Sequence, residues 1–330
     1  MAKSVFKNHK IKIVLASICV MLSMGLKFWN NFTPLPTNNW NPREISRIKV
    51  SDPEDFKFAV FGDHRGNRSV LKPLLRDIDK SKEMAFAIDG GDLVNVGEKG
   101  LFQRYLHMMQ ENVAIPLLTA IGNHDIHNNS SSIYREIFGP TYYAFQVGQS
   151  YFIVLDTAMM KAGFDKVERQ WLENELKKSQ TFQARLVFMH EPLLDPRSND
   201  SNKFLQEKDR RDLLDLFKHY KATHLFASHI HGYFSGVWEG VPYTITGGAG
   251  QRLGGEDPQH SFYHYVKVHI SKGHVETMVM RIDPEGKIGR VFNFLEDIIE
   301  NDLVGLGLLL GAGVLLFPLV LSIWRQHALK

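Results

Sequence analysis

FAVFGDHRGN, residues 58–67, is an apolar run followed by a glycine and then Asp63. A short apolar run bounded by glycine is typical of a buried strand, so Asp63 is expected just beyond the strand's carboxyl end. The same arrangement recurs along the chain. Further apolar runs lead to Asp92, to Asn123, to His190, and to His229 with His231. Because the carboxyl ends of strands in open α/β sheets meet at one edge, we expect these side chains to converge.

The surrounding sequence alternates apolar runs with amphipathic stretches. The strand-like runs are FKFAVFG (56–62), EMAFAIDGG (83–91), IPLLTAIGN (115–123), YFIVLDT (151–157), ARLVFMH (184–190) and THLFASH (223–229), and the helical stretches are 69–82, 99–112, 165–178 and 203–220. Later runs resemble antiparallel strands: VPYTITGG (241–248), FYHYVKVHI (262–270), HVETMVMRI (274–282) and GRVFNF (289–294), with turns at Gly273 and at 284–286. The pattern predicts an α/β (α+β) fold in four layers, a β-sandwich of mixed sheets flanked by helices.

The composition excludes several classes of function. The chain has 330 residues, of which 44% are hydrophobic, and can bury one sizeable core. Its formal charge is +3, and four lysines of the first dozen residues account for this excess, so we expect no nucleic-acid-binding groove. Cys19 is the only cysteine, which excludes an intramolecular disulfide. The oligomeric state is left open.

The residues at the strand ends indicate a metal centre. Carboxylates, an amide oxygen and imidazoles form a mixed nitrogen and oxygen set that suits Mn, Fe or Zn, and there is no thiolate to favour a softer metal. A shared aspartate can bridge two ions ~3.5–4 Å apart, the arrangement used for displacement at phosphorus. Taken alone, each of these short motifs would be explained as a turn or as a surface or core histidine on a strand. Their order and uniform placement favour one or two divalent metal ions.

The motifs GDHRG, GGDLV, GNHD, MHEP and SHIHG occur in this order and resemble those of the calcineurin-like metallophosphoesterases, from about Phe58 to Met280. The resemblance implies the metallophosphoesterase fold and two groups of metal ligands. One group is Asp63, Asp92 and His231, and the other is Asp92, Asn123, His190 and His229. It also implies that His124 faces the leaving group of the substrate.

The residues around His124 support this role on chemical grounds. A departing alkoxide needs a proton, and His124 beside Asn123 is placed to donate it. Asp125 could fix the tautomer of His124 or raise its basicity, and a helix-capping role for Asp125 is compatible with this. Asp156, at another strand end, is expected to support or cap rather than to bind metal. His64 is expected to point away from Asp63 and to bind no metal.

Arg65 departs from the family pattern, which has histidine at this position. A guanidinium has no lone pair to donate, so the first group loses a ligand. Three outcomes are open: one tightly bound metal with a labile second, two metals with an extra water, or an arginine that pairs with the substrate phosphate. We favour the third combined with the first.

Two apolar segments predict attachment to a membrane. Residues 13–26 follow a lysine cluster and form a signal peptide or a retained signal anchor, of which we favour the anchor. Residues 303–324 carry no charge and can cross a hydrocarbon core of ~30 Å. Basic residues flank both segments on their outer ends, so both termini are expected in the cytoplasm and the domain outside it.

These observations divide the chain and define an expected function. The divisions are an N-terminal segment (1–29), a linker (30–54), the phosphoesterase domain (55–295), a transmembrane helix (303–324) and a tail (325–330). We expect a membrane-anchored, metal-dependent hydrolase of phosphomonoesters or phosphodiesters, with the lipid bilayer and a phosphate ester as partners. The alternative is a binding or scaffold protein on a degenerate phosphoesterase fold.

Overall fold

The computed structural model describes residues 37–126, 128, 131–158, 164–197 and 207–288, with isolated positions 14, 17, 18 and 21. Its helices are α2 (Trp40–Arg47), α3 (Arg68–Lys80), α4 (Lys99–Asn112), α5 (Ser132–Phe138), α6 (Lys166–Lys178) and α7 (Glu207–His219), with short 3₁₀ turns at Asn123–Asp125 and Ser179–Thr181. The strands are β1 (Asp55–Phe61), β2 (Met84–Asp89), β3 (Leu117–Thr119), β4 (Tyr143–Val147), β5 (Ser150–Val154), β6 (Ala184–Phe188), β7 (His224–Ala227), β8 (Tyr233–Trp238), β9 (Val241–Thr246), β10 (His264–Ser271) and β11 (His274–Arg281).

The strands form two mixed sheets. The first sheet has the order β11-β10-β1-β2-β3, and the second has the order β4-β5-β6-β7-β9-β8. The pairs β1–β2, β2–β3, β5–β6, β6–β7 and β7–β9 are parallel, antiparallel hairpins form three of the four sheet edges, and β3 is the fourth edge. The carboxyl ends of the central strands therefore share one rim in each sheet, as the sequence predicts.

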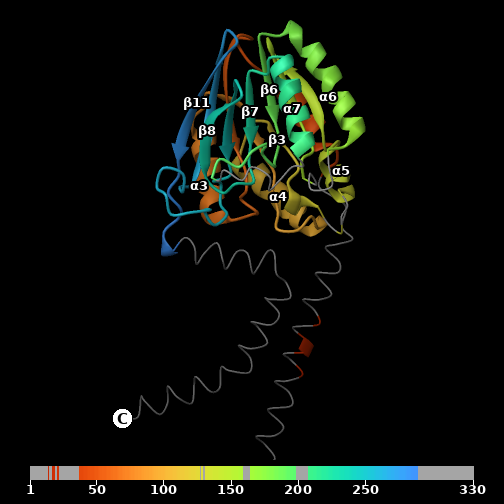
Figure 1. Cartoon of the computed structure of the whole chain (residues 1–330). Helices are drawn as coiled ribbons and strands as arrows, with labels where there is room; N and C mark the ends of the chain where they lie inside the picture. The colour runs from red at the N-terminus through yellow and green to blue at the C-terminus, as the bar shows by residue number, and fades with distance from the viewer. Residues whose placement is uncertain are drawn as a thin grey trace, which may run out of the picture. The chain divides into compact units, whose positions relative to one another are not determined.

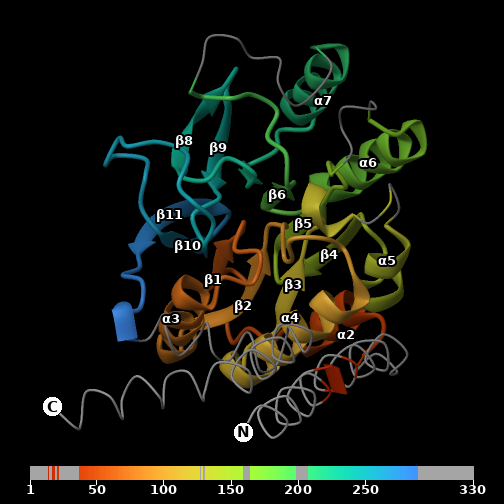
Figure 2. The same ribbon diagram turned by 90° about the horizontal axis from the view of Figure 1, so that it is seen from below.

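Apolar side chains pack on both faces of each sheet, which gives the four layers. Between the sheets lies a phenylalanine-rich core in which Phe58 stacks on Phe86 with ring centroids 4.9 Å apart. On the outer face of the first sheet, helices α3, α4 and α5 bury residues such as Leu71 and Phe102. On the outer face of the second sheet, α6 and α7 do the same (Figures 1 and 2). The predicted α/β sandwich is confirmed.

Part of the segment predicted as a linker (30–54) forms a packed helix, α2. Trp40 and Asn41 of α2 are buried, and the indole Nε1 of Trp40 donates to the carbonyl oxygen of Leu117 at 2.7 Å. The amide of Asn41 exchanges hydrogen bonds with Thr119. Helix α2 therefore covers the open edge strand β3 and belongs to the compact unit Leu35–Glu285.

The sequence patterns did not predict some of the observed elements, and some predicted segments lie outside the described residues. Helix α5 and the edge strands β4 and β8 were not predicted. The hairpin at Gly273 is present between β10 and β11. GRVFNF (289–294) and the apolar segment 303–324 lie outside the described residues, as does most of 13–26. Within the described part of the chain, no helix combines the length and apolar character of a membrane span.

Candidate metal centre

The loops that follow β1 and β2 lie against each other. The amide of Asp63 donates to the carbonyl oxygen of Gly91 at 3.0 Å, and the amide of Arg65 donates to that of Asp92 at 3.0 Å. Both aspartate side chains are fully buried, and both residues have left-handed backbones, with φ of 63° for Asp63 and 58° for Asp92. Strain of this kind persists where surrounding structure fixes it, often at functional sites.

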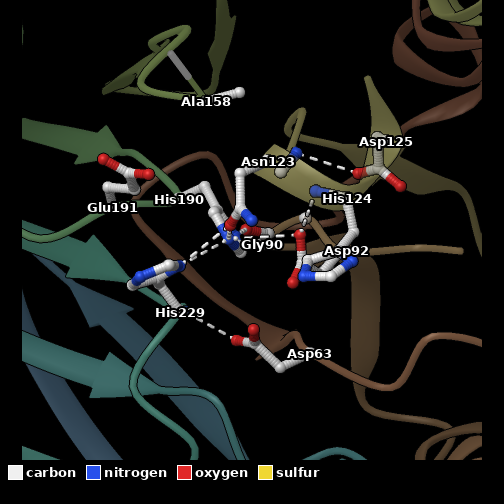
Figure 3. A network of polar contacts seen from close by, with 12 residues as sticks. Asp63, Gly90, Asp92, Asn123, His124, Asp125, Ala158, His190, Glu191 and His229 are labelled. Atoms are coloured by element: carbon white, nitrogen blue, oxygen red, sulfur yellow. Dashed lines mark hydrogen bonds and ion pairs between the residues drawn. The ribbon is translucent and has the colours of Figure 1, made fainter. Parts of the chain in front are cut away.

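The second sheet supplies two imidazoles that face these loops. His190 follows β6 and is fully buried, and His229 follows β7 with a left-handed φ of 67°. Asn123, in the turn after β3, lies between them: its Oδ1 is 3.1 Å from His190 Nε2 and 3.0 Å from His229 Nδ1. Gly122, next to Asn123, lets this turn lie close to the loop after β2, since a Cβ there would be 2.1 Å from the amide nitrogen of Asp92. Figure 3 shows the convergence.

The donor atoms fit a small cation. His190 Nε2 lies 3.3 Å from His229 Nδ1 and 3.3 Å from Asp92 Oδ1. A cation with bonds of about 2.1 Å holds neighbouring ligand atoms at right angles about 3 Å apart, which matches these distances. Asp63, Asp92 and His190 each offer a ligand atom within 4.8 Å of the others, and Asp63 Oδ1 is buried with no hydrogen-bond partner. The residues present therefore fit a divalent metal ion.

Backbone carbonyls orient two of the imidazoles. His190 Nδ1 donates to the carbonyl oxygen of Gly90 at 2.9 Å, and His231 Nδ1 donates to that of Arg252 at 2.9 Å. Each Nε2 is then turned toward the carboxylates, and His231 Nε2 lies 3.6 Å from Asp63 Oδ1. Such carbonyl contacts fix the tautomer of histidines that bind metals. All six predicted ligand residues are thus brought to one rim.

The electrostatics of the rim favour a cation. Burial lowers the pKa of His190, but the charges of Asp92 and Asp63 more than offset this, so its pKa lies above the usual value. Burial, followed by the charge of His190, lowers the pKa of His229 to about 4, which keeps this imidazole neutral near pH 7. A buried pair of carboxylates that raises the proton affinity of a neighbour also attracts a metal ion.

Arg65 contacts a candidate ligand. Its Nε and Nη2 donate to Asp92 Oδ2 at 3.1 and 2.8 Å, and its side chain is 16% exposed. The sequence predicted a contact with substrate phosphate but not this ion pair. Both ring nitrogens of the buried His64 have other partners, which agrees with its predicted role outside the metal centre: Nδ1 accepts from the amide of Gly66, and Nε2 donates to Asp89 Oδ2 at 2.8 Å.

His124 lies at the rim, but its expected partner is wrong. Its backbone amide donates to Asp92 Oδ1 at 2.9 Å, and its Nδ1 donates to the carbonyl oxygen of Asn95 at 2.9 Å. The two oxygens of Asp125 instead accept from the amides of Gly122 and Val94. Burial, then the charge of Asp92, raises the pKa of Asp125 well above its usual range. Asp125 therefore caps the turn that carries His124, which is the structural role the sequence also allowed.

Thr157 was missed by sequence reasoning. Its Oγ1 accepts from the backbone amides of His190 and Glu191 at 3.0 and 2.8 Å, and thereby holds the loop after β6. Neighbouring Asp156 accepts from the amide of Ala158, which agrees with the predicted capping role. A threonine after an apolar strand carries no signal that distinguishes it from many others, so no sequence pattern points to Thr157.

A pocket of about 470 Å³ opens beside His231. Its lining includes Phe234 and His260, whose rings stack with centroids 4.3 Å apart. Arg197 also lines it and is held by Asp195 through two hydrogen bonds, from Nε at 2.9 Å and from Nη2 at 2.8 Å. The pocket therefore places an aromatic surface and the Arg197–Asp195 ion pair next to the candidate metal centre.

Comparisons with known proteins agree with this geometry. Residues 56–233 match the family model of the calcineurin-like phosphoesterases. The human serine/threonine-protein phosphatase CPPED1 is 30% identical over 159 residues, which cover 44% of this chain and 50% of the relative. The chain thus spans about half the length of this curated relative.

Solved structures show the same fold. The purple acid phosphatase PPD1 of yellow lupin superposes with a TM-score of 0.55 at 16% identity, covering 72% of this chain and 55% of that one. GAP50 of Plasmodium, described as an anchor in the inner membrane complex, superposes with a TM-score of 0.54 at 14% identity, covering 73% and 94%. Because the family model matches more than half of the chain and the ligand residues of its motifs converge, the chain belongs to the calcineurin-like phosphoesterase family.

Proposed function

We propose that the protein is a metal-dependent phosphoesterase that hydrolyses a phosphomonoester or a phosphodiester. One observation carries the proposal: donor atoms of Asp92, Asn123, His190 and His229, from four separate loops, approach one another at 3.0–3.3 Å. A divalent cation held there would neutralise charge on the phosphoryl group and make a water molecule more acidic. Mn, Fe and Zn all suit this donor set.

Other residues of the chain would donate the proton, contact the phosphoryl group and make room for the rest of the substrate. His124 Nδ1 is bound to the carbonyl of Asn95, so protonation of its Nε2 makes that atom the one able to donate a proton to the leaving alkoxide. Arg65 uses Nε and Nη2 on Asp92, and its partly exposed guanidinium can still offer Nη1 to a phosphoryl oxygen. The pocket beside His231 offers space for the organic part of the substrate.

A scaffold without activity is the second candidate function. The fold occurs in GAP50, which is described as an anchor, and Arg65 shows that one ligand position has changed. The convergence of the other ligand residues and of His124 favours the enzyme, because a site that had lost its activity would be expected to lose several of these residues at once.

Removal of metal is expected to abolish activity. Purified protein treated with a chelator should hydrolyse neither 4-nitrophenyl phosphate nor bis(4-nitrophenyl) phosphate, and Mn²⁺ should restore turnover of at least one. His190→Ala should stay inactive after Mn²⁺ is added, since it lacks a buried donor atom. His269→Ala, which changes a surface histidine of β10, is the matched control and should respond like the parent. Absence of turnover with Mn²⁺, Fe²⁺ and Zn²⁺ would favour the scaffold.

We also propose that the domain is tethered to a membrane and faces away from the cytoplasm. The proposal rests on the basic residues outside the two apolar segments of the sequence. A reporter fused after Lys330 is expected in the cytoplasm, and a reporter inserted between Asn199 and Ser201 is expected outside it. Finding the inserted reporter in the cytoplasm would reverse the topology and leave the chemistry unchanged.

A further inference from the structure

Arg65 lies among the residues that the family resemblance assigns to the first of two metal ions. Two of its nitrogens, Nε and Nη2, donate to Asp92 Oδ2 at 3.1 and 2.8 Å. His231 in turn faces Asp63 Oδ1 at 3.6 Å. The guanidinium therefore lies directly against Asp92, the carboxylate that the two ions would share, while Asp63 and His231 face each other.

A guanidinium in this place opposes a metal ion there for two reasons. It has no lone pair with which to bind a metal, and it stays protonated at any ordinary pH. Its fixed charge lies beside the carboxylate that the first ion would need, so a cation entering that position meets repulsion in a buried setting where screening is weak.

The second group of ligands is not disturbed by Arg65. The guanidinium contacts Oδ2 of Asp92, whereas Oδ1 of the same carboxylate lies 3.3 Å from His190 Nε2. One carboxylate thus presents an oxygen to the arginine and another to the imidazoles. This division leaves the donor atoms of Asn123, His190 and His229 available to one cation.

We propose, building on the metal-dependent function proposed above, that the centre holds a single divalent cation and that the guanidinium of Arg65 occupies the position of the other. The cation lies among Asp92, Asn123, His190 and His229, within reach of Asp63. His231 binds no metal in this arrangement and pairs with Asp63. Arg65 supplies the positive charge that a first metal ion would bring to the phosphoryl group.

Metal stoichiometry tests this directly. Protein freed of metal and equilibrated with Mn²⁺ should retain one ion per chain by elemental analysis, and its electron paramagnetic resonance spectrum should show isolated Mn²⁺. Arg65→His should retain two ions and show the broadened signal of a coupled pair, because an imidazole replaces the guanidinium. Histidine is among the residues that tolerate the left-handed backbone of this position, where φ is 44°. Arg65→Lys keeps the charge, is the matched control and should retain one ion.

A second pair of variants separates the two positions. His231→Ala should leave the stoichiometry of the parent at one ion, whereas the same change in the Arg65→His background should lower it from two ions to one. His190→Ala should lower the parent to none. Circular dichroism of each variant shows whether it is folded, and the unchanged one-ion count of His231→Ala can be read even if Arg65→His does not fold.

The results distinguish failure of the single-cation centre from failure of the phosphoesterase function. Two ions in the parent, or two in Arg65→Lys, would overturn the single-cation centre while leaving the phosphoesterase function intact. One ion in a folded Arg65→His variant would also overturn it, because the guanidinium would not be what excludes the second ion. One ion in the parent without turnover of any phosphate ester would overturn the proposed function and keep the inference. No retained ion would overturn both.

Discussion

Asp92→Asn is expected to abolish retention of the metal ion and to lower kcat/KM by at least about a hundredfold. Loss of a residue that only supports a metal ligand costs about 10–100-fold in activity, and a ligand should cost at least the upper value. Asp92 Oδ1 accepts from the amide of His124 and faces His190, and its Oδ2 accepts from Arg65. An asparagine amide lacks the negative charge that attracts both the cation and the guanidinium. The change therefore weakens the metal position and releases Arg65 at the same time.

Elemental analysis beside kcat/KM with 4-nitrophenyl phosphate measures this effect. Asp79→Asn is the matched control, because Asp79 is an exposed carboxylate that accepts from the amide of Ala114 on the surface. It should keep the metal content and activity of the parent. Near-normal metal content in Asp92→Asn would mean that the residues at the strand ends do not share an ion through this carboxylate.

His124→Ala is expected to lower kcat about 10²–10⁴-fold for a substrate with a poor leaving group, such as an alkyl phosphate, the usual range for loss of a proton donor. The loss should be less than about tenfold for 4-nitrophenyl phosphate, whose leaving group departs without a proton. The reason lies in the hydrogen bond from Nδ1 to the carbonyl of Asn95, which directs the other ring nitrogen away from the backbone.

The comparison of the two substrates separates proton donation from positioning. His107→Ala, which changes a histidine of helix α4, is the control and should act on both substrates like the parent. An equal loss on both substrates in His124→Ala would show that this side chain helps to bind phosphate or to hold the loop and does not donate the proton. The metal content of the variant should remain that of the parent.

The fold and the convergence of the candidate ligand residues were predictable because they depend on local patterns that the chain repeats. Each ligand follows an apolar strand, and parallel strands bring their carboxyl ends together whatever lies between them. His64 lies beyond the end of β1, in a turn where Asp63 and Arg65 have left-handed backbones, so the alternation of side chains along the strand does not by itself determine its direction. Helix α2 was missed because an eight-residue helix with Asn and Pro at its start lacks a recognisable apolar stripe, and only β3 reveals what Trp40 covers.

The partners of the rim residues could not be predicted, because they depend on distances between loops. Asn95 contacts His124 through a backbone carbonyl, a group that every residue carries. The choice of Arg65 between Asp92 and a substrate is decided by how closely the loops after β1 and β2 approach, which no spacing in the sequence specifies. In the sequence, Asp125 stands next to His124, which suggests that it orients that imidazole. In the structure, its two carboxylate oxygens accept from the amides of Gly122 and Val94 instead.

The candidate ligands come from both sheets: Asp63, Asp92 and Asn123 follow strands of the first, and His190 and His229 follow strands of the second. A bound ion would therefore fasten the two halves of the sandwich at this rim, since unfolding would separate its ligands. Each tenfold rise in free metal above the dissociation constant would add about 1.4 kcal/mol to the free energy of unfolding. The lifetime of the protein against proteases would then follow the supply of metal ions in its surroundings, so that a shortage of metal removes the molecule as well as its activity.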